Sequence, residues 1–109
     1  MIIAVALNEN NSSALVDEHF GRCAWYCIYN SENSKFEYIE NANRSAEEGA
    51  GSKSAEILLQ KGIQIAIAGR FGVKVVEFFR KNNIQMIIPE TQKNLEEILE
   101  MFNNYKLKK

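Results

Sequence analysis

The stretch Asn8-Glu-Asn-Asn-Ser-Ser-Ala-Leu-Val-Asp-Glu-His-Phe-Gly21 decides the fold of this 109-residue chain. It joins a short apolar run at residues 1–7 to an aromatic run at residues 24–29, and both runs are typical of strands. Asn and Ser side chains hydrogen-bond their own backbone and so compete with helix formation. The stretch therefore predicts a long loop, where a doubly wound, flavodoxin-like sheet would need a crossover helix.

The next part of the chain predicts a hairpin. A polar turn at residues 30–34 leads into residues 35–40, where polar and apolar side chains alternate. This alternation predicts a third strand with one polar face, near the edge of the sheet. A second polar loop follows at residues 41–51 and ends in Gly-Ala-Gly.

Helices and short buried strands alternate in the second half. Apolar spacing predicts helices at residues 52–61 and 73–82, each followed by a buried strand, at 64–68 and 84–88. Thr91 is expected to cap a last helix. The apolar face of that helix falls at Leu95, Ile98, Leu99 and Phe102.

These connections predict an α/β fold. Strands joined without helices should be antiparallel, and strands joined through helices should be parallel with right-handed crossovers. We expect one domain over residues 1–109, with a mixed five-stranded sheet of order 3-2-1-4-5 and flanking helices.

Composition excludes several classes of protein. A net charge of −1 gives no electrostatic footprint for nucleic acid, and no apolar run has the length of a membrane span. No targeting segment is recognised at the N-terminus. Two cysteines in a chain large enough to fold without disulfides favour a reducing, cytoplasmic location.

The predicted topology brings chemically active residues to one edge of the sheet. The loops at residues 8–22, 41–51 and 69–72 should meet there, where open α/β sheets bind ligands. Two helix N-termini should face the same edge, and their free N–H groups favour an anion. Four glycines border these helix starts: Gly49, Gly51, Gly69 and Gly72. Such glycines also occur in ordinary tight loops, so they do not identify the ligand.

The candidate ligands lie between residues 17 and 27. Cys23 and Cys27 on one strand would lie about 13 Å apart on the same face, too far for one metal ion. Cys27 is then expected to be a small buried side chain, whereas Cys23 is either exposed or buried. His19 with Cys23 suits a preassembled cluster or a site completed across a dimer. Arg22 pairs either with an anionic ligand or with nearby carboxylates.

Enzyme signatures are missing from the sequence. It contains no Gly-x-Ser-x-Gly elbow and only one histidine, and residues 2–7 and 64–68 carry no carboxylate for a nuclease site. A nucleophile formed by Cys23 and His19 would lack an assigned third group. We therefore expect a non-enzymatic protein, with an enzyme using Cys23 as nucleophile as an alternative.

Several motifs together resemble one known family. They are the opening Ile-Ile-Ala-Val-Ala, the His19-Phe-Gly-Arg22 element before an aromatic strand, the Gly49-Ala-Gly51 loop, and the Gly69-x-Phe-Gly72 turn. In combination they resemble the dinitrogenase iron–molybdenum cofactor biosynthesis family, of the NifX and NifB C-terminal type. The resemblance covers about residues 1 to 102.

The resemblance implies a fold, a cargo and roles for single residues. It implies a ribonuclease H-like motif without nuclease activity, and binding of an iron–sulfur or iron–molybdenum cluster. His19 would be the cluster ligand with Cys23 as helper, while Arg22 and Gly21 would lie against the cargo. Partners would be a cluster donor or acceptor protein. The alternative is an interaction or regulatory module of the same fold without metal cargo.

Overall fold

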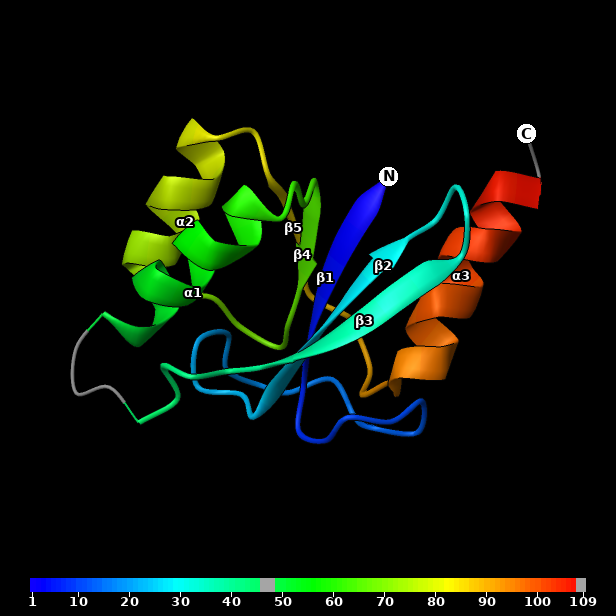
Figure 1. The fold of residues 1–109 in the computed structure, drawn as a ribbon, viewed down its shortest axis with the longest axis horizontal. Helices are drawn as coiled ribbons and strands as arrows, with labels where there is room; N and C mark the ends of the chain where they lie inside the picture. The colour runs from blue at the N-terminus through cyan, green and yellow to red at the C-terminus, as the bar shows by residue number, and fades with distance from the viewer. Residues whose placement is uncertain (46–48, 108–109) are drawn as a thin grey trace.

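The computed structural model describes residues 1–45 and 49–107, so residues 46–48 of the second polar loop lie outside the described part. Figure 1 shows strands and helices along one continuous sheet. In chain order they are β1 (Ile2–Leu7), β2 (Trp25–Asn30), β3 (Lys35–Glu40), α1 (Ala50–Gln60), β4 (Ile65–Ile67), α2 (Val73–Lys81), β5 (Gln85–Ile87) and α3 (Leu95–Leu107).

The sheet has the expected order, β3-β2-β1-β4-β5. β1 is central, because Val5 pairs with Cys27 of antiparallel β2 on one side and with Ile67 of parallel β4 on the other. β3 pairs with β2 in antiparallel register and forms one edge, and β5 pairs parallel with β4 and forms the other. The mixed five-stranded α/β fold predicted from the connections is confirmed.

The sheet is covered on both faces by different helices. In Figure 1, α1 and α2 lie together on one side of the strands and α3 lies on the other. The side chains of β1 divide accordingly: Ala4 and Ala6 pack toward α1 and α2, whereas Ile3, Val5 and Leu7 pack toward α3. This alternation follows from the two-residue period of a strand, and it produces two separate hydrophobic clusters.

One sheet edge gathers the loops. Leu7 at the end of β1 pairs with Trp25 at the start of β2, and Trp25 pairs with Glu40 at the end of β3. The parallel strands β4 and β5 end in the same direction as β1. Beyond this edge the chain turns to opposite faces, because α2 follows β4 on one face and α3 follows β5 on the other (Figure 1).

Two local expectations were wrong. α1 begins at Ala50, two residues before the expected start, because Gly49 adopts a left-handed φ of 72° and acts as N-cap. Gly51 therefore lies in the first helical turn and not in the preceding loop. The cap of α3 is Asn94 and not Thr91: the Asn94 Oδ1 accepts the Glu97 N–H at 2.9 Å, and the Glu97 Oε1 accepts the Asn94 N–H at 3.0 Å. This reciprocal pair is a capping box.

None of the helices in the described part of the chain has the length and apolar character of a membrane-spanning segment.

Candidate functional site

The segment that carries His19 is fixed to the end of β4 by backbone hydrogen bonds. Gly69 N–H donates to the Asp17 carbonyl at 2.9 Å, and Phe20 N–H donates to the Arg70 carbonyl at 3.1 Å. His19 and Arg70 consequently form a parallel β-bridge, and both residues are exposed. The structure thus brings a histidine and an arginine, 51 positions apart in sequence, to one solvent-facing position.

A close contact between Gly21 and Gly51 fixes the segment that carries His19 to α1. Gly21 has φ +93°, and a Cβ atom placed on it would lie 2.5 Å from the Gly51 Cα. A Cβ on Gly51 would in turn meet the Cγ2 atom of Val75 in α2 at 2.7 Å. Gly21 and Gly51 are therefore close-packing positions that join the His19 segment, α1 and α2.

A buried network of polar side chains makes hydrogen bonds with the turn that follows His19. The Asn41 side chain donates to the carbonyls of Gly21 at 2.9 Å and Cys23 at 2.8 Å, and it accepts the Ser54 hydroxyl at 3.2 Å. The Gly21 N–H donates to the Tyr26 hydroxyl at 3.0 Å. Among the described residues, no buried side-chain nitrogen or oxygen lacks a partner. Asn41 and Tyr26 thus hold the turn after His19 in one conformation.

Both cysteines are buried and lie on opposite faces of the sheet. Cys23 packs in the cluster under α1 and α2, and Cys27 packs in the cluster under α3, each with 0% of its surface exposed. The expectation that they share a face was wrong, because Cys23 lies in the turn before β2, where strand alternation does not apply. Burial raises the pKa of the Cys23 thiol to about 11 and that of Cys27 to about 12. Both thiols are free, and Cys27 is a buried apolar residue as predicted.

Arg22 reaches toward the loop after β3. Its Nη1 donates to the Arg44 carbonyl at 3.0 Å, and its backbone N–H donates to the His19 carbonyl at 3.2 Å. The Asp17 carboxylate accepts the His19 backbone N–H at 2.9 Å. We call the exposed residues His19, Arg22 and Arg70 at this edge of the sheet the rim. Within it, the Arg22 side chain extends from the loop that carries His19 to the loop after β3.

The four predicted glycines have different roles. Gly49 and Gly72 are exposed N-caps of α1 and α2. Among the described residues, no side chain caps either helix, and a Cβ on either glycine would meet no atom within 4 Å. Gly69 is confined, since a Cβ there would lie 2.7 Å from the Glu18 Cα. Gly51 and Gly69 thus serve packing, whereas Gly49 and Gly72 are exposed residues at helix starts, where the helix dipole favours negative charge.

The donor set does not suit a single metal ion. Within the described residues, no three His, Cys, Asp or Glu side chains are grouped closely enough to hold one. One exposed imidazole with two exposed guanidinium groups suits an anion that carries most of its own ligands better than it suits a bare metal ion.

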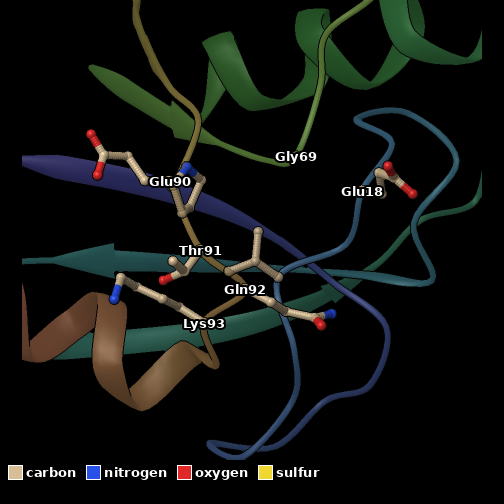
Figure 2. Close-up of a pocket in the computed structure, with 8 residues that line it drawn as sticks. Glu18, Gly69, Glu90, Thr91, Gln92 and Lys93 are labelled. Carbon is tan, nitrogen blue, oxygen red and sulfur yellow. The ribbon is translucent and has the colours of Figure 1, made fainter.

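A pocket near this rim was not predicted from the sequence. It has a volume of about 330 Å³ and lies between the end of β4 and the segment after β5 (Figure 2). It is lined by Val16, Glu18, Gly69, Pro89, Glu90, Thr91, Gln92 and Lys93. The sequence analysis treated residues 89–93 only as a strand end and a helix cap. The position of this segment beyond two parallel strands was the signal that could have revealed the pocket.

The fold and the rim define a small α/β domain built to present a histidine and arginines at the loop-bearing edge of its sheet. The chain belongs to the dinitrogenase iron–molybdenum cofactor family, whose model matches residues 1–105. This confirms the family resemblance seen in the motifs.

Individual relatives agree with this assignment. The chain is 30% identical over 112 residues to the uncharacterized protein MJ0580 of Methanocaldococcus jannaschii, covering 100% of this chain and 91% of the relative. It has the fold of the apo orange protein from Desulfovibrio gigas, with TM-score 0.86, 24% identity, and coverage of 96% of this chain and 88% of that one. It also has the fold of a putative NifB protein from Thermotoga, with TM-score 0.80, 24% identity, and coverage of 94% and 87%.

Proposed function

We propose that this protein is a non-enzymatic carrier of an anionic metallocluster of the iron–sulfur or iron–molybdenum type. The observation that carries the proposal is the backbone β-bridge between His19 and Arg70, which pairs these two residues where both are exposed. Membership in the iron–molybdenum cofactor family supports a cofactor-related role. His19 would bind a metal of the cluster, and Arg22 and Arg70 would balance its negative charge.

The chemistry favours a preassembled cluster as cargo. A mononuclear structural site needs about four protein ligands, whereas a cluster that brings its own sulfides can be held by one imidazole and by charge. The start of α2, at the exposed Gly72, adds N–H groups that attract sulfide or oxo anions. A carrier must also release its cargo, and a single side-chain ligand suits transfer between a donor and an acceptor protein.

Cys23 is the second proposed ligand, and its burial sets a condition on that role. Metals bind the thiolate form, and burial with a pKa near 11 keeps the Cys23 thiol protonated at neutral pH. Cys23 would become a ligand only after the turn at residues 21–24 opens. While the turn stays closed, the Cys23 thiol is buried in the hydrophobic cluster beneath the loop, and His19 is the ligand.

The test is anaerobic loading of the metal-free protein. The purified chain is incubated with iron and sulfide, or with tetrathiomolybdate, then desalted, and bound iron, sulfide and molybdenum are measured per chain. We expect wild type to retain cluster, and His19→Ala to retain at least about tenfold less. Asn10→Ala is the matched control, because Asn10 is an exposed polar residue of the same loop, and it should behave as wild type. Equal retention by wild type and His19→Ala, including no retention by either, would contradict the proposal.

The Cys23→Ala variant tests whether the protein holds the cluster through His19 alone or through His19 and Cys23. Loss of cargo from a folded Cys23→Ala protein would assign the thiol as a second ligand reached by opening of the turn. Full retention would leave His19 as the protein ligand. Circular dichroism and thermal unfolding of each variant distinguish lost binding from lost folding.

A further inference from the structure

The segments His19-Phe20 and Arg70-Phe71 lie side by side, and in both of them an exposed residue is followed by one that packs inward. His19 and Arg70 form the parallel bridge, and the Phe20 N–H donates to the Arg70 carbonyl at 3.1 Å. Phe20 is buried, and the half-buried Phe71 packs against the same hydrophobic cluster. Successive side chains of an extended segment point to opposite sides, so inward packing of the two phenylalanines places His19 and Arg70 together on the outer side.

Three aromatic rings pack together on the inner side, and we call Phe20, Phe71 and Phe79 the ring cluster. The ring centroid of Phe20 lies 5.4 Å from that of Phe71 and 5.4 Å from that of Phe79, and the centroids of Phe71 and Phe79 are 6.3 Å apart. All three separations fall within the range of favourable aromatic pairs, roughly 4.5–7 Å. Because Phe79 is a buried residue of α2, the ring cluster attaches both outer segments to that helix.

Phe71 is the member of the ring cluster that adjoins Arg70. The two glycines of its turn, Gly69 and Gly72, have no side chain to anchor the turn, so the only side-chain packing next to Arg70 in the turn is that of Phe71. Within the described residues, the Arg70 side chain makes no ion pair or hydrogen bond that would orient it independently. The direction in which Arg70 leaves the turn is therefore set by the bridge to His19 and by the packing of the Phe71 ring on Phe20.

We propose that Phe71 is a positioning residue of the rim: its ring contact with Phe20 keeps Arg70 on the same side as His19, so that one anionic cargo meets both residues. Phe71 does not touch the cargo and acts through Arg70. The inference rests on the proposed function for the nature of the cargo, but the geometry stands on the bridge and the ring cluster alone. Without the ring of Phe71, the Gly69 N–H would still donate to the Asp17 carbonyl, while Arg70 would leave the turn without a fixed direction.

The first test measures the bridge without any cargo. Phe71→Ala should accelerate amide hydrogen exchange at Phe20, whose N–H donates to Arg70, about two- to tenfold relative to the amides of β1, the range that one aromatic pair is worth. Phe78→Ala is the matched control: Phe78 is also half-buried and its ring lies 6.1 Å from that of Phe79, but among the described residues it has no ring contact with Phe20. Unchanged exchange at Phe20 in Phe71→Ala, or equal acceleration in Phe78→Ala, would overturn the proposal.

The second test measures binding of tetrathiomolybdate by equilibrium dialysis. Phe71→Ala should weaken binding about two- to tenfold, Phe71→Tyr, which keeps the ring, should bind as wild type, and Phe78→Ala should leave binding unchanged.

A double-mutant cycle shows whether Phe71 acts through Arg70. In an Arg70→Gln background, Phe71→Ala should cause no further loss of affinity, because the group that it positions is gone. A loss that persists in that background would assign Phe71 a merely structural role and refute the proposal. Absence of binding by wild type would refute the proposed function and the cargo role of Phe71 with it. Binding by wild type that Phe71→Ala leaves intact would refute the positioning role alone.

Discussion

Gly21 and Gly51 touch backbone to backbone: a Cβ atom on Gly21 would lie 2.5 Å from the Gly51 Cα and 2.8 Å from the Gly51 nitrogen. This contact joins the loop that carries His19 to the first turn of α1. Because the atoms that would collide are backbone atoms, the contact cannot be relieved by a rotamer change. The His19 loop and α1 therefore keep a fixed relative position.

Gly21→Ala should destabilise the protein by about 3 kcal/mol. The substitution forces a side chain into a left-handed φ of +93° and into the Gly51 backbone, and each effect costs on the order of 1–3 kcal/mol. Urea unfolding monitored by circular dichroism measures the loss. Gly72→Ala is the matched control, since φ is −68° there and no atom of the described part of the chain lies within 4 Å of the added Cβ. A loss at Gly72 equal to that at Gly21 would refute the close-packing argument.

Asn41→Ala should cost about 3 kcal/mol of stability. It removes the donors to the Gly21 and Cys23 carbonyls, and leaving a buried polar group unpaired costs on the order of 1–3 kcal/mol. Amide hydrogen exchange at Gly21, whose N–H donates to the Tyr26 hydroxyl in the same turn, should accelerate more than exchange in β1. Asn10→Ala, at an exposed position, should change neither quantity. Uniform acceleration across the whole sheet would show that Asn41 does not act locally.

Asn94→Ala should destabilise the protein by about 1 kcal/mol, whereas Thr91→Ala should change stability by less than about 0.5 kcal/mol. Asn94 makes both hydrogen bonds of the capping box with Glu97, and loss of an N-cap side chain has about this cost. Thermal unfolding of the two variants side by side decides between the two caps. A larger effect at Thr91 would restore the cap predicted from the sequence.

Stability should fall as pH rises above about 9. The Cys23 and Cys27 thiols have an ordinary pKa of 9.0, and burial raises their folded-state pKa values to about 11 and about 12. Above pH 9 the unfolded chain releases thiol protons that the folded chain retains, so the equilibrium shifts toward unfolding. Each thiol contributes a slope of up to about 1.4 kcal/mol per pH unit between its unfolded and folded pKa values.

Denaturant unfolding at pH 8, 9 and 10 measures this dependence. The Cys23→Ala, Cys27→Ala double variant should lose most of the decline between pH 9 and 10. A residual decline at higher pH is expected, because burial also raises the pKa of Tyr26 above its ordinary value of 10.0. A wild-type stability that stays flat to pH 10 would contradict the burial of the thiols.

Arg70→Gln should weaken binding of tetrathiomolybdate, and more strongly at low than at high salt. The exposed Arg70 beside His19 acts mainly through charge, and charge interactions at a surface are screened over about 8 Å at physiological ionic strength. Equilibrium dialysis at two salt concentrations measures the effect. Arg80→Gln, with an exposed side chain in the last turn of α2, is the matched control. Equal losses in both variants would indicate a nonspecific effect of net charge.

The sheet could be predicted because its determinants are local. The polar stretch between β1 and β2 excludes a helix and so predicts the antiparallel start, and the helical crossovers before β4 and β5 predict the rest of the order 3-2-1-4-5. The same topology predicts that the loop containing His19 ends beside the turn containing Arg70. The hydrogen bonds from Gly69 to Asp17 and from Phe20 to Arg70 confirm that meeting.

The rest of the site depends on contacts between distant residues. The sequence could not indicate that Gly21 and Gly51 lie in backbone contact, so that a side chain on Gly21 would collide with Gly51. It also could not indicate that the Asn41 side chain donates to carbonyls 18 and 20 positions earlier. The burial of Cys23 also depends on α1 and α2 packing over it, which no local pattern encodes. The pocket was missed because its walls come from three separate segments, although the position of residues 89–93 beyond two parallel strands indicates where a pocket could form.

The two hydrophobic clusters on opposite faces of the sheet have an evolutionary consequence. α3 packs against Ile3, Val5 and Leu7, whereas the support for His19 is built from the cluster beneath α1 and α2. Substitutions beneath α3 should thus change resistance to heat and denaturant without altering the segment that carries His19. Substitutions beneath α1 and α2 would instead change the position of His19, so the stability of the sheet and the geometry of the His19 segment can change separately during evolution.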